Sequence, residues 1–188
     1  LQNLPSRGAN AGKLKKSIVA PDGYVMIDSD SSQIEARTLA WLAGQDDLVE
    51  AFEKGQDVYK MMASKIYDKP ESEITKSERF VGKTTILGCG YGMGAAKFQI
   101  QLKAFGVDIP IEECRHIIQV YRESNQQITA LWKRAQNCLQ AILSKTQAQF
   151  SEVDAVKFDA MENGFLLPSG LWQRYEGLWK SDVNGKVE

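Results

Sequence analysis

The sequence has little histidine and cysteine and lacks any long apolar run. Its one histidine, His116, excludes sites that need two or three histidine ligands. The cysteines Cys89, Cys114 and Cys138 lie 25 and 24 residues apart, which argues against a disulfide framework or a zinc site and fits a reducing compartment. No run approaches the roughly 20 apolar residues of a membrane span. The chain begins with Leu1 without a signal-peptide core, and we expect it to be a piece of a longer protein.

Charge is unevenly distributed, although the net charge is only −1 and the 43% hydrophobic content is that of an ordinary globular protein. Residues 1–20 carry four basic residues and no acidic one, residues 22–57 carry nine acidic and two basic residues, and residues 60–103 carry eight basic and four acidic residues. A uniformly basic nucleic-acid binder would instead carry an excess of basic residues throughout its sequence. The pattern suits a site where carboxylates hold cations and basic residues hold phosphates. Solvated surface charge is the alternative.

The periodicity predicts an α+β chain that is mainly helical. The apolar run Tyr24–Ile27 predicts a buried strand. Residues 164–167 and 171–175, joined by Pro168-Ser169-Gly170, predict a C-terminal hairpin. Helical patterns lie between them. The first is stopped by Gly44, the second is capped by Asp46 or Asp47 and ended by Gly55, and the third is capped by Asp57 and terminated by Pro70. A capping box at Thr75–Glu78 opens a fourth helix that runs to about Leu87 or beyond, and a helical stretch from Ile111 to Lys145 has a break at Ser124-Asn125.

Three carboxylates follow the predicted strand within eight residues, namely Asp28, Asp30 and Glu35. On a strand, Asp28 and Asp30 would share one face. Magnesium typically takes one or two carboxylates together with substrate phosphates and water. The segment therefore indicates a metal site, and the alternative is that these acids favour the start of the following helix.

Four residues spaced by four, Arg79, Lys83, Leu87 and Tyr91, form one slanted stripe on the helix that follows the capping box. A helix N-terminus with Arg and Lys beside it suits a polyphosphate, and the apolar residue and the tyrosine suit a base and a sugar. The alternative is a surface helix with a basic face. The glycine run over residues 88–94 matches neither a Rossmann nor a P-loop signature.

Both segments resemble motifs of the family A DNA polymerases. Asp30-Ser31-Ser32-Gln33-Ile34-Glu35-Ala36-Arg37 resembles motif A, usually D-Y-S-Q-I-E-L-R, and the stripe with Tyr91-Gly92 resembles motif B. Leu1-Gln2-Asn3-Leu4-Pro5 is similar to the L-Q-N-I-P segment that precedes motif A. Residues 57–60 and 35–37 most resemble the bacteriophage-type branch of the family.

The resemblance implies a role for each matched residue. Asp30, with the backbone carbonyl of Ser31, would bind metal, and Lys83 would act with it in catalysis. Glu35 would block the sugar 2′ position and bond Tyr91. The implied nucleotide contacts are Arg79, Lys83, Leu87, Tyr91, Glu35, Gln33 and Tyr59, where many relatives have His in place of Tyr59. The implied DNA contacts are Gln2, Asn3, Lys13, Lys15, Lys16 and Gly92.

The sequence departs from the family pattern at several places, and the usual T-G-R segment upstream of L-Q-N-I-P is also absent from it. Ser31 replaces an aromatic residue, and Leu87 replaces Phe or Tyr. The His-Asp-Glu triplet of motif C, with its second metal-binding aspartate, is absent, because His116 is followed by Ile117. We therefore expect a fragment: residues 1–36 as the start of the palm with its strand, and residues 37–188 as helical fingers ending in the hairpin, without thumb or exonuclease.

The implied activity is that of a DNA-directed DNA polymerase in replication, which extends a primer with deoxynucleotides by two-metal nucleotidyl transfer. The expected cofactor is Mg²⁺, with two ions in the complete enzyme. The expected partners are primer-template DNA and deoxynucleoside triphosphates, without a membrane, in the cytoplasm (of a bacterial host for a phage protein). The fragment alone is expected to be inactive. A family A enzyme specialised for repair and a non-catalytic helical nucleic-acid-binding module are the alternatives.

Overall fold

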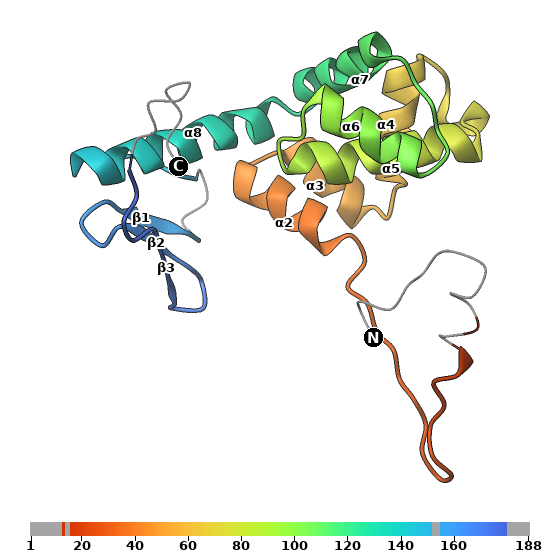
Figure 1. Cartoon of the computed structure of the whole chain (residues 1–188), viewed down its shortest axis with the longest axis horizontal. Helices are drawn as coiled ribbons and strands as arrows, with labels where there is room; N and C mark the ends of the chain where they lie inside the picture. Colours follow the sequence, from red (N-terminus) through yellow and green to blue (C-terminus); the bar gives the residue numbers. More distant parts are fainter. Residues whose placement is uncertain (1–12, 14–15, 152–154, 180–188) are drawn as a thin grey trace. The chain divides into compact units, whose positions relative to one another are not determined.

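A computed structural model describes residues 13, 16–151 and 155–179 (Figure 1). The chain divides into two units, Leu1–Ser32 and Gln33–Glu188. Within the described residues, none of the helices is both long and apolar enough to cross a membrane.

In the first unit, the predicted buried strand over Tyr24–Ile27 is wrong. These residues have no strand conformation, and Val25 and Ile27 are 84% and 86% exposed. The amide of Tyr24 instead closes a turn onto the carbonyl of Pro21 at 3.0 Å. A strand exists only when a neighbour completes its hydrogen-bond ladder, and the described residues of this unit supply no such neighbour. Beta-branched composition alone is therefore insufficient here.

The second unit begins with seven α-helices. Their bounds are α2 (Ile34–Ala43), α3 (Asp46–Glu53), α4 (Val58–Tyr67), α5 (Lys76–Gly90), α6 (Ala95–Ala104), α7 (Ile111–Ser124) and α8 (Gln126–Ser144), with a 3₁₀ turn η1 at Glu71–Glu73. The predicted signals are confirmed at several ends. Gly44 ends α2 in the left-handed region at φ 71°, Asp57 caps α4, and Thr75 and Glu78 form both bonds of a capping box on α5. Helix α6 was not predicted.

Helices α4 and α5 pack closely at Gly82. A Cβ atom at this position would lie 2.2 Å from the Tyr59 carbonyl oxygen and 3.0 Å from the Ala63 amide nitrogen. Only glycine allows this approach of the two backbones. The core around this contact contains Phe98, Leu102, Ile117, Tyr121 and Ile128, all at most 1% exposed. Since α2 also packs on α5 and α8, the start of the unit is held against this core.

Beyond α8, the chain forms a small antiparallel sheet (Figure 1). Its strands β1 (Lys157–Asp159), β2 (Gly164–Leu166) and β3 (Trp172–Arg174) lie in the order β1-β2-β3. The predicted hairpin is confirmed, with Phe165 opposite Gln173. Phe165 also packs edge-on against Phe150 at a ring-centroid distance of 4.8 Å. The described residues are therefore mainly helical with a short sheet, which confirms the α+β class.

Candidate functional site

The residues expected to bind metal and DNA lie largely in the first unit. Asp30 and Ser31 are exposed, as are Lys13 and Lys16. Gln2, Asn3 and Lys15 lie outside the described residues. The described part of the chain brings no group of three or more His, Cys, Asp or Glu residues together as a metal cluster. The expectation that Asp28 and Asp30 share one strand face is wrong, because residues 28–30 form no strand.

The residues expected to hold the triphosphate gather on one aromatic ring in the second unit. Tyr59, near the start of α4, is only 6% exposed. The Arg79 guanidinium carbon lies 5.2 Å from its ring centroid, and the Lys83 ammonium nitrogen lies 5.8 Å from it. Both cations come from the N-terminal half of α5 and gain cation–π attraction from the ring. We call Tyr59 with these two cations the Tyr59 platform.

Sequence reasoning missed the acidic partner of this platform. Asp57 Oδ2 accepts a bond from Arg79 Nε at 2.7 Å, across 22 residues of sequence. Partial burial of Asp57 acts to raise the pKa of its carboxyl. The bond and charge of Arg79 and the backbone amides of Lys60 and Tyr59 outweigh this and hold that pKa below its ordinary value. The only signal in the sequence was helix capping, which uses the other carboxylate oxygen.

The Tyr59 hydroxyl ties the platform to the segment resembling motif A. Gln33 precedes α2 in the left-handed region at φ 58°, and its side chain makes no capping bond to that helix. It lies near the Tyr59 hydroxyl instead. Burial raises the pKa of Tyr59, whereas the interaction with the Gln33 side chain and the charge of Arg79 act to lower it.

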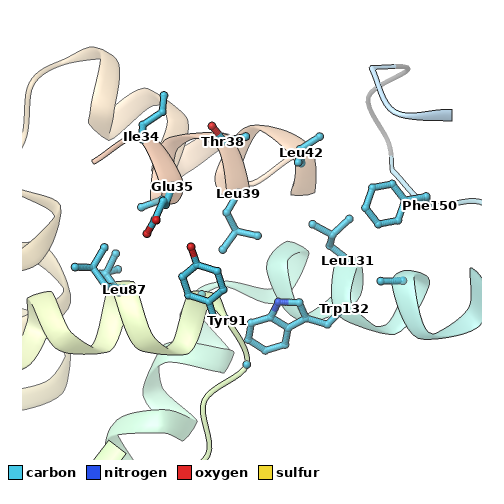
Figure 2. A pocket seen from close by; sticks show the side chains of 15 residues that line it. Ile34, Glu35, Thr38, Leu39, Leu42, Leu87, Tyr91, Leu131, Trp132 and Phe150 are labelled. Atoms are coloured by element: carbon cyan, nitrogen blue, oxygen red, sulfur yellow. The ribbon is translucent and has the colours of Figure 1, made fainter. Parts of the chain in front are cut away.

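The second half of the α5 stripe borders an apolar pocket of about 730 Å³ (Figure 2). Its walls come from α2, the second half of α5, the start of α8 and the loop after α8; the lining residues are Ile34, Glu35, Ala36, Thr38, Leu39, Leu42, Ile86, Leu87, Gly90, Tyr91, Gly92, Leu131, Trp132, Ala135 and Phe150. The predicted stripe therefore has a cationic half at the Tyr59 platform and an apolar half at this pocket.

Glu35 and Tyr91 point toward each other across the mouth of the pocket (Figure 2). Interaction of the Tyr91 hydroxyl with the Glu35 carboxylate is the main cause that raises the pKa of Tyr91, with smaller contributions from desolvation and the Glu35 charge. The Tyr91 side chain is otherwise 73% exposed. Gly92 follows at φ 71°, where glycine is favoured, and turns the chain away from α5.

Two aromatic residues of the pocket were not predicted as site residues. Trp132 from α8 is partly buried and stacks on Tyr121 at a centroid distance of 6.5 Å. Phe150, from the loop after α8, forms another wall and contacts the sheet. Their position depends on how α8 crosses α2, and no local pattern in the sequence reports that crossing.

Comparison with known proteins identifies relatives of this chain. A sequence model described as "DNA polymerase family A" matches residues 1–149. The chain is 32% identical over 130 residues to "DNA polymerase I, thermostable" of Thermus aquaticus, covering 69% of this chain and 15% of that protein. It is 37% identical over 95 residues to "DNA polymerase I" of Pseudomonas aeruginosa, covering 50% of this chain and 10% of that protein. The chain thus spans a small part of these relatives.

A solved structure shows the same relationship. The POL domain of Pol1 from M. smegmatis, in complex with DNA primer-template and dNTP, superposes with a TM-score of 0.58 at 29% sequence identity. The match covers 77% of this chain and 24% of that chain. The relatives named here are bacterial DNA polymerase I enzymes. They support the family and give no support to the bacteriophage-type branch.

Proposed function

The chain belongs to DNA polymerase family A, and on this basis we propose that it forms part of a DNA-directed DNA polymerase. The observation that carries the proposal is the α5 stripe. Two cations lie over Tyr59 where a triphosphate would bind, and Leu87 and Tyr91 follow at an apolar pocket suited to a base and a sugar. The partners are primer-template DNA and deoxynucleoside triphosphates, and the setting is the cytoplasm.

The proposed reaction is a nucleotidyl transfer. The primer 3′ oxygen attacks the α-phosphorus of the incoming nucleotide and forms a new P–O bond. The bond from the α-phosphorus to the oxygen that bridges to the β-phosphate breaks, and pyrophosphate leaves. Arg79 and Lys83 neutralise charge on the triphosphate and hold it in line for attack. This division of labour is positional and electrostatic.

Asp30 and the Ser31 carbonyl would hold a divalent metal ion. Both offer the oxygen ligands that Mg²⁺ takes, and a site with one protein carboxylate, substrate phosphates and water is ordinary for this ion. Bound Mg²⁺ would supply charge neutralisation at the reacting phosphate. The complete enzyme would use two such ions. In this scheme residues 1–36 belong to the palm and residues 37–188 to the fingers.

Sugar and DNA contacts follow the same assignment. Glu35, which points toward the Tyr91 hydroxyl (Figure 2), would occupy the space of a ribose 2′ hydroxyl, which favours replication or repair with deoxynucleotides. Leu87 would lie against the sugar, and Gln33 and Tyr59 would support the phosphates. DNA contacts would come from Gln2, Asn3, Lys13, Lys15, Lys16 and Gly92. The bacteriophage-type branch rests only on residues 35–37 and 57–60.

Nucleotide binding by the 188-residue chain tests the proposal. Deoxyadenosine triphosphate with Mg²⁺ is titrated calorimetrically into the wild type and into Lys83→Ala, which should bind about tenfold or more weakly because a charge-assisted phosphate contact is lost. Lys103→Ala removes an exposed α6 lysine paired with Asp108 and serves as the control, with unchanged affinity. DNA binding without any nucleotide binding would indicate the non-catalytic module instead.

A further inference from the structure

Asp57 holds two elements of the second unit at once. Its Oδ1 accepts a bond from the Lys60 amide at 3.2 Å and so caps α4. Its Oδ2 accepts a bond from Arg79 Nε at 2.7 Å and so reaches α5. Because the cap is part of the helix start, the carboxylate is a fixed point and not a mobile surface group. Arg79 is therefore anchored to the end of a helix.

The anchor leaves the outer edge of the arginine available. A guanidinium has five N–H donors, and Asp57 engages the one on Nε. Among the described residues, the structure gives no hydrogen bond to the other four, which are on the two Nη atoms. The Tyr59 ring covers the guanidinium at 5.2 Å from its centroid. Arg79 is thus held at Nε by an ion pair and lies over a ring, while its two Nη atoms have no hydrogen-bond partner among the described residues.

We propose that Asp57 is a positioning residue for the incoming nucleotide, which aims the Nη fork of Arg79 at the triphosphate by gripping Nε. This inference rests on the proposed function, since it assumes that Arg79 meets a triphosphate. Arginine binds phosphate best through a planar fork, and a free arginine side chain loses much rotational freedom when it is fixed. An arginine fixed before the ligand arrives does not lose that freedom on binding.

The direction in which triphosphate affinity changes when Asp57 is neutralised distinguishes a positioning role from a purely electrostatic one. Removing the negative Asp57 would by electrostatics alone favour an anion and tighten triphosphate binding. Loss of positioning would weaken it. Weaker binding after neutralisation therefore identifies positioning, and tighter binding would show that Asp57 competes with the triphosphate for Arg79.

Two substitutions remove the ion pair and keep the cap. Asn and Ser both cap helices about as well as Asp, so Asp57→Asn and Asp57→Ser should leave α4 intact. The control Glu50→Gln removes the carboxylate of a 2.6 Å ion pair with Lys54 elsewhere in the unit. The probe is deoxyadenosine triphosphate with Mg²⁺, titrated calorimetrically into the full 188-residue chain, and thermal unfolding of each variant establishes that it is folded.

We expect both Asp57 variants to bind about three- to tenfold more weakly, the size of effect given by one immobilised side chain, with Glu50→Gln unchanged. In an Arg79→Ala background, Asp57→Asn should weaken binding less than about twofold, because a positioning residue acts only through its partner. Unchanged or tighter binding of Asp57→Asn, or equal weakening in both backgrounds, overturns the inference. The proposed function is overturned instead if the wild type binds no nucleotide, or if Lys83→Ala binds nucleotide as tightly as the wild type.

Discussion

Replacing Gly82 by alanine should destabilise the chain although alanine is the better helix former. The added Cβ would lie 2.2 Å from the Tyr59 carbonyl oxygen, whereas ordinary carbon–oxygen contacts lie at about 3.3–3.6 Å. Backbones of α4 and α5 would have to separate by about 1 Å. Overpacking of this kind costs about 1–3 kcal/mol, and the helix gain is at most about 1 kcal/mol. Because the obstacle is backbone, we take the upper end and expect a net loss of about 2 kcal/mol.

Urea unfolding followed by far-ultraviolet circular dichroism measures this loss. Gly88→Ala on the same helix is the matched control, since its new Cβ would meet side chains alone, the end of Met93 at 3.1 Å and the Gln101 side-chain oxygen at 3.9 Å. A flexible methionine can move, so this variant should keep or gain up to about 1 kcal/mol. If both variants had the same free energy of unfolding, the close approach of α4 and α5 at Gly82 would be refuted.

Three further outcomes are expected. The Glu78 carboxylate, bonded first by Lys69 and then by the Thr75 amide and hydroxyl, has its pKa lowered to about 2 from 4.5. Its stabilising effect is full above 4.5 and is lost as pH falls toward 2. Carboxyl-carbon NMR should show that low midpoint in the wild type and a rise toward 4.5 in Lys69→Met, which removes the largest cause. Glu35→Gln should lower the pKa of Tyr91, because the raising bond and charge are removed, and NMR of labelled tyrosine would count against the contact if that pKa stayed raised. The 188-residue chain should not extend a primer, because motif C is absent from its sequence; extension that survives removal of contaminating enzymes would contradict this.

Local signals in the sequence predicted most helix ends, because the cap and the residue it satisfies are close in sequence. Asp57 and Gly44 are examples. Helix α6 (Ala95–Ala104) was missed because its N-cap, Gly94, has no side chain to mark the start. The strand at residues 24–27 failed for the opposite reason: its pattern is local, but its stability depends on a neighbouring strand.

In the candidate site as well, features set by local spacing could be predicted from the sequence, and contacts between distant residues could not. The spacing by four from Arg79 to Tyr91 predicted that these residues share one face of a helix. The structure places the first three on α5 and Tyr91 at its C-cap, with the cations at Tyr59 and the remainder at the pocket. The bond from Arg79 to Asp57 could not be predicted, since it joins residues 22 positions apart. It exists because glycine at position 82 lets two helices approach, which is a property of the pair and not of either helix.

Phe150 links the pocket physically to the sheet. Its ring is at once a wall of the pocket and the edge-on neighbour of Phe165 in β2. Loss of the Phe165 ring would remove support from that wall. A substitution in the sheet, far along the chain from α2 and α5, should therefore alter the shape of the pocket.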